Sequence, residues 1–100
     1  MFVRLYLSSV DPSDLPEVQR VFREDVVPAL RAQPGCASVE LISNIDANAG
    51  GLVEGAALSR WDSLEHLEAA LATPEVQGSI LRVRDYLRQE PVTKTFEVLD

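Results

Sequence analysis

The sequence predicts an α+β fold in which four strands form one antiparallel sheet and two helical regions cover one of its faces. Three observations lead to this fold class. Apolar residues alternate with period two in four stretches, and they recur at helical spacing in two others. The order of these stretches is strand, helix, strand, strand, helix, strand, and a βαββαβ chain commonly folds in this way. We expect a single domain over residues 1–100.

The first strand is predicted over residues 2–8. Val3, Leu5 and Leu7 fall on one side of the strand. The other side carries Phe2, Arg4, Tyr6 and Ser8. This second side is mixed, so it suits either a surface or the wall of a polar cavity.

The first helix follows the strand-breaking run SSVDPSD. Ser13 or Asp14 is a suitable cap, and Glu17 completes a capping box from Asp14. One apolar stripe then runs along Leu15, Val18, Phe22, Val26 and Leu30. Pro28 has no N–H for the carbonyl of Glu24, so we expect a kink or a change of helix type near residues 24–28. Gln33-Pro34-Gly35 ends the helix.

Two further strands are predicted over residues 36–45 and 52–60, joined as a hairpin by the glycine-containing turn at 46–51. The second of them runs directly into a helix at Trp61. Asp62 is a good N-cap for that helix, and Glu65 completes a capping box. In such a box the residue before the cap packs on the fourth helical residue, which places Trp61 beside His66.

In the helix that follows, Leu64, Leu67 and Leu71 face one way. A further helix is predicted from Thr73 as cap and Pro74 at the first helical position. Its apolar stripe consists of Val76, Ile80, Val83 and Leu87. The last strand is expected over residues 91–99.

With both helical regions on one side, the ferredoxin-like arrangement leaves the other face of the sheet uncovered. We expect that face to hold Phe2, Tyr6 and Ile42, which is too apolar for water contact. This apolar face therefore predicts a homodimer in which two chains pair through their uncovered sheet faces. A cavity between the two sheets, or between sheet and helices, is the default ligand site.

Composition excludes several classes of protein. The net charge of −7 argues against a nucleic-acid partner or an anionic membrane surface. No apolar run reaches the roughly 18 residues of a membrane span. The single cysteine, Cys36, permits no internal disulfide, and with one histidine the sequence contains no metal cluster. We expect a cytoplasmic protein with no metal.

Several motifs together resemble the antibiotic biosynthesis monooxygenase family of dimeric α+β barrels. They are the sequence PGC at 34–36, the R-W-D-S corner around Trp61 and the E-x-L-E-A-x-L helix from Glu65. Trp61 matches the family's tryptophan at the strand-to-helix corner. The resemblance implies oxidation of electron-rich aromatic hydroquinones of the polyketide type by molecular oxygen without a cofactor. Other members degrade haem, but they rely on a histidine in the later helix, and the helix from Pro74 contains none.

Five residues are candidates for a site. Arg4, Tyr6 and Glu40 point into the dimer-facing cavity if the uncovered face is assigned correctly, and an arginine there stabilises a phenolate. The alternative is that Arg4 and Glu40 form an ion pair across neighbouring strands. His66 is either a general base, because histidine titrates near neutral pH, or a surface residue. Trp61 either anchors the core or stacks on a ligand.

Three functions remain open from the sequence, the third being an isomerase or lyase activity as in other branches of the superfamily, whose sites also use scattered pocket residues. The first is a cofactor-independent monooxygenase acting on a small electron-rich aromatic. The second is a non-catalytic dimer that binds a small apolar ligand or supports a pathway partner, which agrees with the lack of a nucleophile–base pair or metal cluster. The fold does not decide between them.

Overall fold

The computed structural model describes residues 1–46 and 50–100. The predicted order of elements is confirmed, and the four strands form one antiparallel sheet in the order β2-β3-β1-β4. The elements are, in chain order, β1 (Phe2–Val10), the 3₁₀ turn η1 (Pro12–Asp14), α1 (Leu15–Val21), the π-helical turn η2 (Phe22–Val26), α2 (Val27–Arg31), β2 (Cys36–Ser43), β3 (Val53–Trp61), α3 (Leu64–Leu71), α4 (Pro74–Arg84) and β4 (Val92–Glu97).

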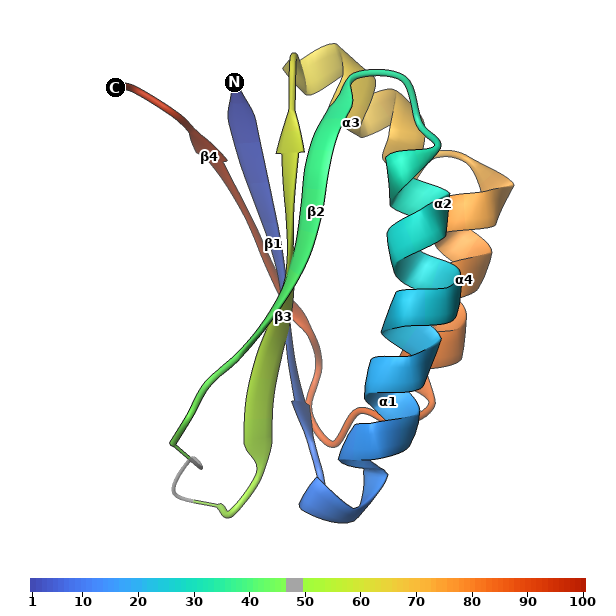
Figure 1. Ribbon diagram of the computed structural model, residues 1–100, viewed down its shortest axis with the longest axis vertical. Helices are drawn as coiled ribbons and strands as arrows, with labels where there is room; N and C mark the ends of the chain where they lie inside the picture. Colours follow the sequence, from blue (N-terminus) through green and yellow to red (C-terminus); the bar gives the residue numbers. More distant parts are fainter. Residues whose placement is uncertain (47–49) are drawn as a thin grey trace.

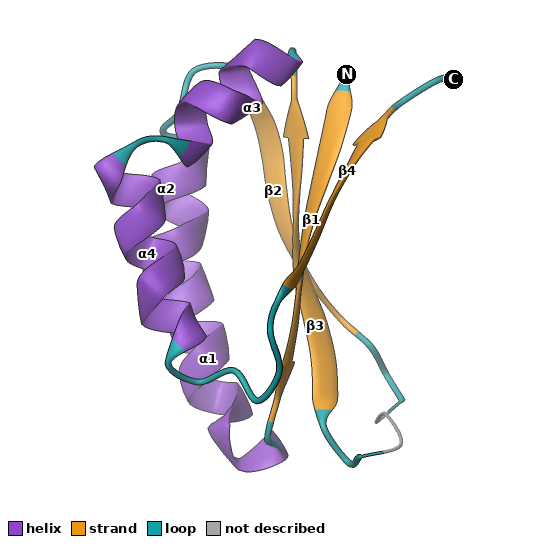
Figure 2. Cartoon of the chain, turned by 180° about the vertical axis from the view of Figure 1, so that it is seen from behind, coloured by secondary structure: helices purple, strands orange, loops and turns teal. Residues whose placement is uncertain are grey.

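All helices lie on one face of the sheet, and β4 diverges from them at one edge (Figure 1). The view from behind shows the same two layers, and none of the helices in residues 1–46 and 50–100 lies on the opposite face of the sheet (Figure 2). Both termini lie at one end, where Val98 N–H donates to the carbonyl of Met1 at 2.9 Å. Within the described residues, no helix is long and apolar enough to cross a bilayer.

The alternation predicted for β1 is confirmed, but the assignment of its two sides was wrong. Arg4 and Tyr6 face the helices, where the Tyr6 ring contacts that of Phe22. Phe2 shares their side of the strand, so Phe2 and Tyr6 do not belong to the uncovered face. Ile42 does lie on that face, as predicted. A shallow surface depression there is lined by Leu7, Ile42 and Ala56.

The uncovered face, called the open face below, is mostly apolar but carries three charged side chains. Strand pairing in register places these side chains on it: Val3, Leu5, Leu7, Glu40, Ile42, Ala56, Leu58, Arg60, Val92, Lys94 and Phe96. Phe96 and Val92 are about half exposed. Exposed apolar surface of this extent is typical of a face that meets a partner.

The change of helix type predicted near Pro28 is confirmed. Residues 22–26 form a π-helical turn, closed by the bond from Val27 N–H to the carbonyl of Phe22. The capping box predicted from Asp14 was wrong: Asp14 makes no side-chain cap bond, and Asp11 instead accepts from Ser13 N–H to cap η1. Pro12 then occupies the first turn, where its missing N–H costs nothing.

At the strand-to-helix corner, the predicted N-cap is one residue too early. Asp62 N–H donates to the carbonyl of Gly35 at 2.9 Å, which keeps Asp62 in the extension of the sheet. Ser63 is the N-cap of α3 and accepts from His66 N–H. The capping box between Asp62 and Glu65 was therefore wrong. Leu67 is buried as predicted, but Leu64 is exposed.

Helix α4 agrees closely with the prediction from the sequence. Thr73 caps α4 by accepting from Val76 N–H, and Pro74 lies in its first turn, as predicted. Val76 and Val83 are fully buried. In the hairpin, Gly51 has a φ of 77°, which a glycine adopts without strain. Residues 47–49 of the predicted turn lie outside the described part of the chain.

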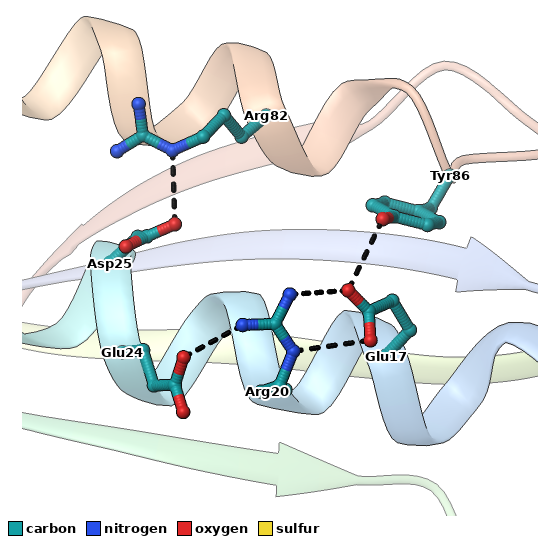
Figure 3. A network of polar contacts seen from close by, with 6 residues as sticks. All are labelled: Glu17, Arg20, Glu24, Asp25, Arg82 and Tyr86. Atoms are coloured by element: carbon teal, nitrogen blue, oxygen red, sulfur yellow. Dashed lines mark hydrogen bonds and ion pairs between the residues drawn. The ribbon is translucent and has the colours of Figure 1, made fainter.

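Ion pairs join the helices at their outer surface (Figure 3). Arg20 bridges Glu17 and Glu24 within the first helical region, and this contact lowers the pKa of the Glu17 carboxyl. Arg82 of α4 donates to Asp25 at 3.0 Å, and the Tyr86 hydroxyl donates to Glu17 at 3.4 Å. Such exposed pairs add little stability individually. The pair between Arg82 and Asp25 joins α4 to η2 at the surface, and other residues of both elements line the cavity described next.

Candidate functional site

Two cavities lie end to end between the sheet and the helices, and Phe22 contributes to the wall of both. The smaller, called the Arg4 cavity, has a volume of about 20 Å³. It is lined by Arg4, Tyr6, Phe22, Val26, Leu30, Ala57, Ser59, Leu67, Leu71, Ile80 and Val83. The larger, called the Ser8 cavity, has a volume of about 110 Å³ and lies toward the hairpin end of the sheet.

Arg4 is the charged group of the Arg4 cavity. Its Nη1 donates to Thr95 Oγ1 on the exposed strand β4 at 3.3 Å. Burial lowers the pKa of the guanidinium, because the charged form loses contact with water. No ion pair involves Arg4 within residues 1–46 and 50–100. A half-buried cation without a counter-ion is stabilised by an anion that enters the cavity.

Tyr6 lies next to Arg4 on the same side of β1. Its hydroxyl is buried and has no hydrogen-bond partner among the described residues. Its ring meets Phe22 edge to face at a centroid distance of 6.4 Å. Burial raises the pKa of Tyr6, with smaller opposing effects from Arg84, which lowers it, and Glu90, which raises it. Tyr6 therefore presents a neutral hydroxyl that is free to donate to a ligand.

Trp61 lies in the core at the end of the same sheet face. It is fully buried, and its Nε1 donates to Ser59 Oγ at 2.8 Å. Ser59 in turn lines the Arg4 cavity. The indole therefore supports the cavity through Ser59, and the geometry favours the core-anchor interpretation of Trp61 over a stacking platform.

His66 and Glu40 lie away from the Arg4 cavity. His66 is exposed on α3, with Nδ1 2.8 Å from Ser63 Oγ, and its ring covers Gly35 so closely that no side chain would fit at residue 35. Trp61 faces inward while His66 faces solvent, so the predicted indole–imidazole pair was wrong.

Glu40 belongs to the open face, opposite to Arg4. The predicted cluster of Arg4, Tyr6 and Glu40 is therefore wrong, and only Arg4 and Tyr6 share a cavity. The alternative ion pair between Arg4 and Glu40 is also excluded, because β3 lies between their strands.

In the part of the chain that the structure describes, no group of three or more His, Cys, Asp or Glu side chains is placed to hold a metal ion. Cys36 is partly buried at the start of β2, and burial raises the pKa of its thiol, so the reactive thiolate is disfavoured. The polar groups of the Arg4 cavity are thus one cation, Arg4, and the neutral hydroxyls of Tyr6 and Ser59, among apolar side chains.

The model of the antibiotic biosynthesis monooxygenase family matches residues 1–80, which include β1, Trp61 and most of the Arg4 cavity. The chain belongs to this family. None of the curated proteins matches it.

Solved structures confirm that this family member has the family's fold. A crystal structure of an antibiotic biosynthesis monooxygenase is 18% identical and superposes with a TM-score of 0.75, each chain being covered over 100% of its length. The protein Rv0793 from Mycobacterium tuberculosis is also 18% identical with a TM-score of 0.75, over 99% of this chain and 95% of the other. At this identity the likeness shows the fold alone.

Apart from Arg4 and Tyr6, the lining residues of the Arg4 cavity were not identified as site residues from the sequence, and Phe22, Ala57 and Ser59 are the most informative of them. Phe22 appeared only as part of a helical stripe. A signal for the other two does exist, because β3 carries the small residues Gly55, Ala57 and Ser59 on the side that faces the helices. Small side chains on the covered face of a central strand leave space beneath the helices.

Proposed function

We propose that this single domain is a cofactor-independent monooxygenase that oxidises a small electron-rich phenol or hydroquinone with molecular oxygen. The observation that carries the proposal is the half-buried Arg4 cation, without a counter-ion among the described residues, beside the partnerless Tyr6 hydroxyl. A phenolate oxygen satisfies both groups at once, since it accepts from the guanidinium and from the hydroxyl. Family membership supports the same reaction class.

In the proposed reaction, Arg4 stabilises the substrate as its phenolate and so lowers the pKa of the bound phenol. The phenol proton leaves to solvent, which reaches Arg4 from the side of the exposed strand β4. The electron-rich anion transfers one electron to oxygen, and the resulting radical pair combines on the ring. One oxygen atom stays in the quinone product and the other leaves as water with two substrate hydrogens. Because the substrate supplies all the electrons, no external reductant or cofactor is required.

The second candidate function is ligand binding without turnover. The Arg4 cavity has a volume of only about 20 Å³, and none of its lining side chains is a histidine or a carboxylate that would act as a base. These features suit a protein that holds a small polar group without transforming it.

Oxygen uptake separates the two candidates. We expect the purified protein to consume oxygen in the presence of at least one member of a panel of substituted phenols and hydroquinones, with product and oxygen in a ratio of one to one. The control is the same panel without protein, because hydroquinones oxidise slowly in air. Binding of a panel member by calorimetry without oxygen uptake would instead favour the non-catalytic function.

We also propose that two chains pair through the open face as a homodimer. Its apolar side chains support this arrangement, because a monomer would leave them in water. The cytoplasmic location remains a prediction.

Replacing Leu5 with glutamate tests the dimer. Leu5 lies directly opposite Lys94, so Leu5→Glu gains a cross-strand charge pair in the monomer while it places a charge in the middle of the interface. We expect the dimer dissociation constant to rise more than about hundredfold, measured by size-exclusion chromatography with light scattering. Leu81→Glu, on the exposed side of α4, is the matched control. A Leu5→Glu protein that stays dimeric would contradict this interface.

A further inference from the structure

We propose that the Ser8 cavity is a second compartment of the ligand site, that Phe22 is the gate between the two compartments, and that the ligand is a phenol with an extended apolar substituent. The phenol lies at Arg4 and Tyr6, and the substituent occupies the Ser8 cavity. The inference rests on the proposed function for the position of the phenol, and it adds the length and character of the rest of the molecule.

The two compartments form one line along the sheet. Arg4 and Tyr6 of β1 line the first, and Ser8 and Val10 on the same side of that strand line the second. Same-side residues of a strand lie roughly 7 Å apart, so Arg4 and Ser8 lie roughly 13 Å apart along it. On the neighbouring strand β3, Ser59 lines the first compartment and Gly55 lines the second. A straight ligand therefore follows the strands from one compartment to the other.

The volumes require both compartments. About 20 Å³ is space for one water molecule, whereas an apolar cavity that binds benzene measures about 150 Å³. A phenol at Arg4 therefore fits only when a wall moves. Phe22 is the wall residue that borders the 110 Å³ Ser8 cavity. Rotation of its ring out of the space between the two cavities joins them and frees the volume of the ring, which a substituted phenol needs because the cavities together are smaller than a benzene site.

The backbone at Phe22 favours such a movement. Phe22 begins the π-helical turn, and its carbonyl accepts from the residue five positions later, Val27. Pro28 supplies no N–H, so the normal hydrogen-bond register cannot be completed here. Isolated π-helical turns are frequent at functional sites. The gate thus lies where the helix is least regular.

The lining of the Ser8 cavity specifies the substituent. Most of the side chains are apolar, and the polar ones are uncharged except for Arg23, which is exposed. The lining residues are Ser8, Val10, Leu15, Val18, Gln19, Phe22, Arg23, Leu41, Ser43, Val53 and Gly55, together with Ile42 and Ala56, whose side chains belong to the open face. An alkyl chain or a further apolar ring matches this surface, whereas a second charged group does not.

The test is a series of 4-alkylphenols from 4-methylphenol to 4-heptylphenol, with binding measured by calorimetry under nitrogen. We expect the affinity to rise about fourfold for each added CH₂ until the Ser8 cavity is full, and then to level off. Equal affinities for the methyl and heptyl compounds, or no binding of either, would overturn the inference.

A variant in which a larger side chain fills the Ser8 cavity tests the position of the substituent. In Leu15→Trp, we expect the affinity for 4-heptylphenol to fall to about that for 4-methylphenol, while Leu81→Trp on the exposed side of α4 retains the full length dependence. Gln19→Trp, at a half-buried position on the same cavity, provides a second filling variant if Leu15→Trp does not fold. If a folded variant with a filled Ser8 cavity still bound longer alkylphenols more tightly, the alkyl substituent would lie elsewhere, and the inference would be refuted.

The complementary variant removes the Phe22 gate. Phe22→Ala removes the ring between the compartments, so we expect it to raise the affinity for 4-heptylphenol more than that for 4-methylphenol. Because these measurements exclude oxygen, they do not depend on turnover. A length dependence together with no oxygen uptake from any member of the panel of substituted phenols and hydroquinones would refute the proposed oxidation and keep the two-compartment site.

Discussion

Replacing Arg4 with glutamine is expected to lower the rate of oxygen uptake at neutral pH about hundredfold or more. Removal of one preorganised group that stabilises developing negative charge costs catalysis about this much in other enzymes. Arg4 provides the charge in the Arg4 cavity, since the remaining lining side chains are uncharged. Glutamine keeps an N–H donor, but it is shorter than arginine and carries no charge, so the variant removes the electrostatic contribution together with the bond from Nη1 to Thr95.

The pH dependence distinguishes this effect from a loss of structure. A cation beside the phenol stabilises the anionic form and lowers the pKa of the bound substrate, so uptake begins at a lower pH when Arg4 is present. In Arg4→Gln the pH–rate midpoint is expected to move upward, with part of the lost rate recovered at alkaline pH. Tyr6→Phe is expected to lower the rate less, because a neutral donor is lost and the cation remains.

The control is Arg82→Gln, which removes an arginine from the exposed ion pair with Asp25 and leaves the cavity unchanged. Uptake by Arg4→Gln equal to that of the wild type, in a protein with wild-type circular dichroism, would show that the anion is stabilised elsewhere. A lower rate with an unchanged pH midpoint would assign Arg4 a packing role instead.

The alternation of residues in β1 is readable from the sequence, but the side that faces the helices is not. One side of this strand is wholly apolar, with Val3, Leu5 and Leu7, and the other is mixed, with Phe2, Arg4, Tyr6 and Ser8. A period of two fixes which residues share a side, and only a clear difference in polarity says which side enters the core. Here the difference points the wrong way, because the wholly apolar side forms the open face and the mixed side with Arg4 and Tyr6 faces the helices. The error moved Arg4 and Tyr6 to the wrong side of the sheet and grouped them with Glu40.

The strand-to-helix corner after Trp61 shows a second limit of prediction from the sequence. Asp62 and Ser63 are equally good N-caps, and local rules prefer the first because Glu65 follows at the right distance. The bond from Asp62 N–H to Gly35, a residue distant in sequence, decides for Ser63. Pro28 and Thr73 were interpreted correctly because a missing N–H or a side-chain cap acts within one turn. The gate role of Phe22 depends on two cavities that only the packed structure defines.

Replacing Trp61 with alanine is expected to lower the free energy of unfolding by about 3–5 kcal/mol, the range for large aromatic residues removed from a core. The indole is fully buried, and its N–H is satisfied by Ser59, so the substitution creates a cavity and also leaves the Ser59 hydroxyl without this donor. Urea unfolding followed by circular dichroism measures the change, at one protein concentration because a dimer's stability depends on it.

Leu81→Ala is the control for this measurement, since Leu81 is 62% exposed and its removal changes stability by less than about 0.5 kcal/mol. Ser59→Ala leaves the buried indole N–H unpaired and is expected to cost about 1–3 kcal/mol. A loss below about 1 kcal/mol in Trp61→Ala, together with weaker ligand binding, would reverse the assignment made here and make Trp61 a ligand contact. A large loss of unfolding free energy instead means that Trp61 supports the cavity through Ser59. In that case Arg4 and Tyr6 are the residues that contact the ligand.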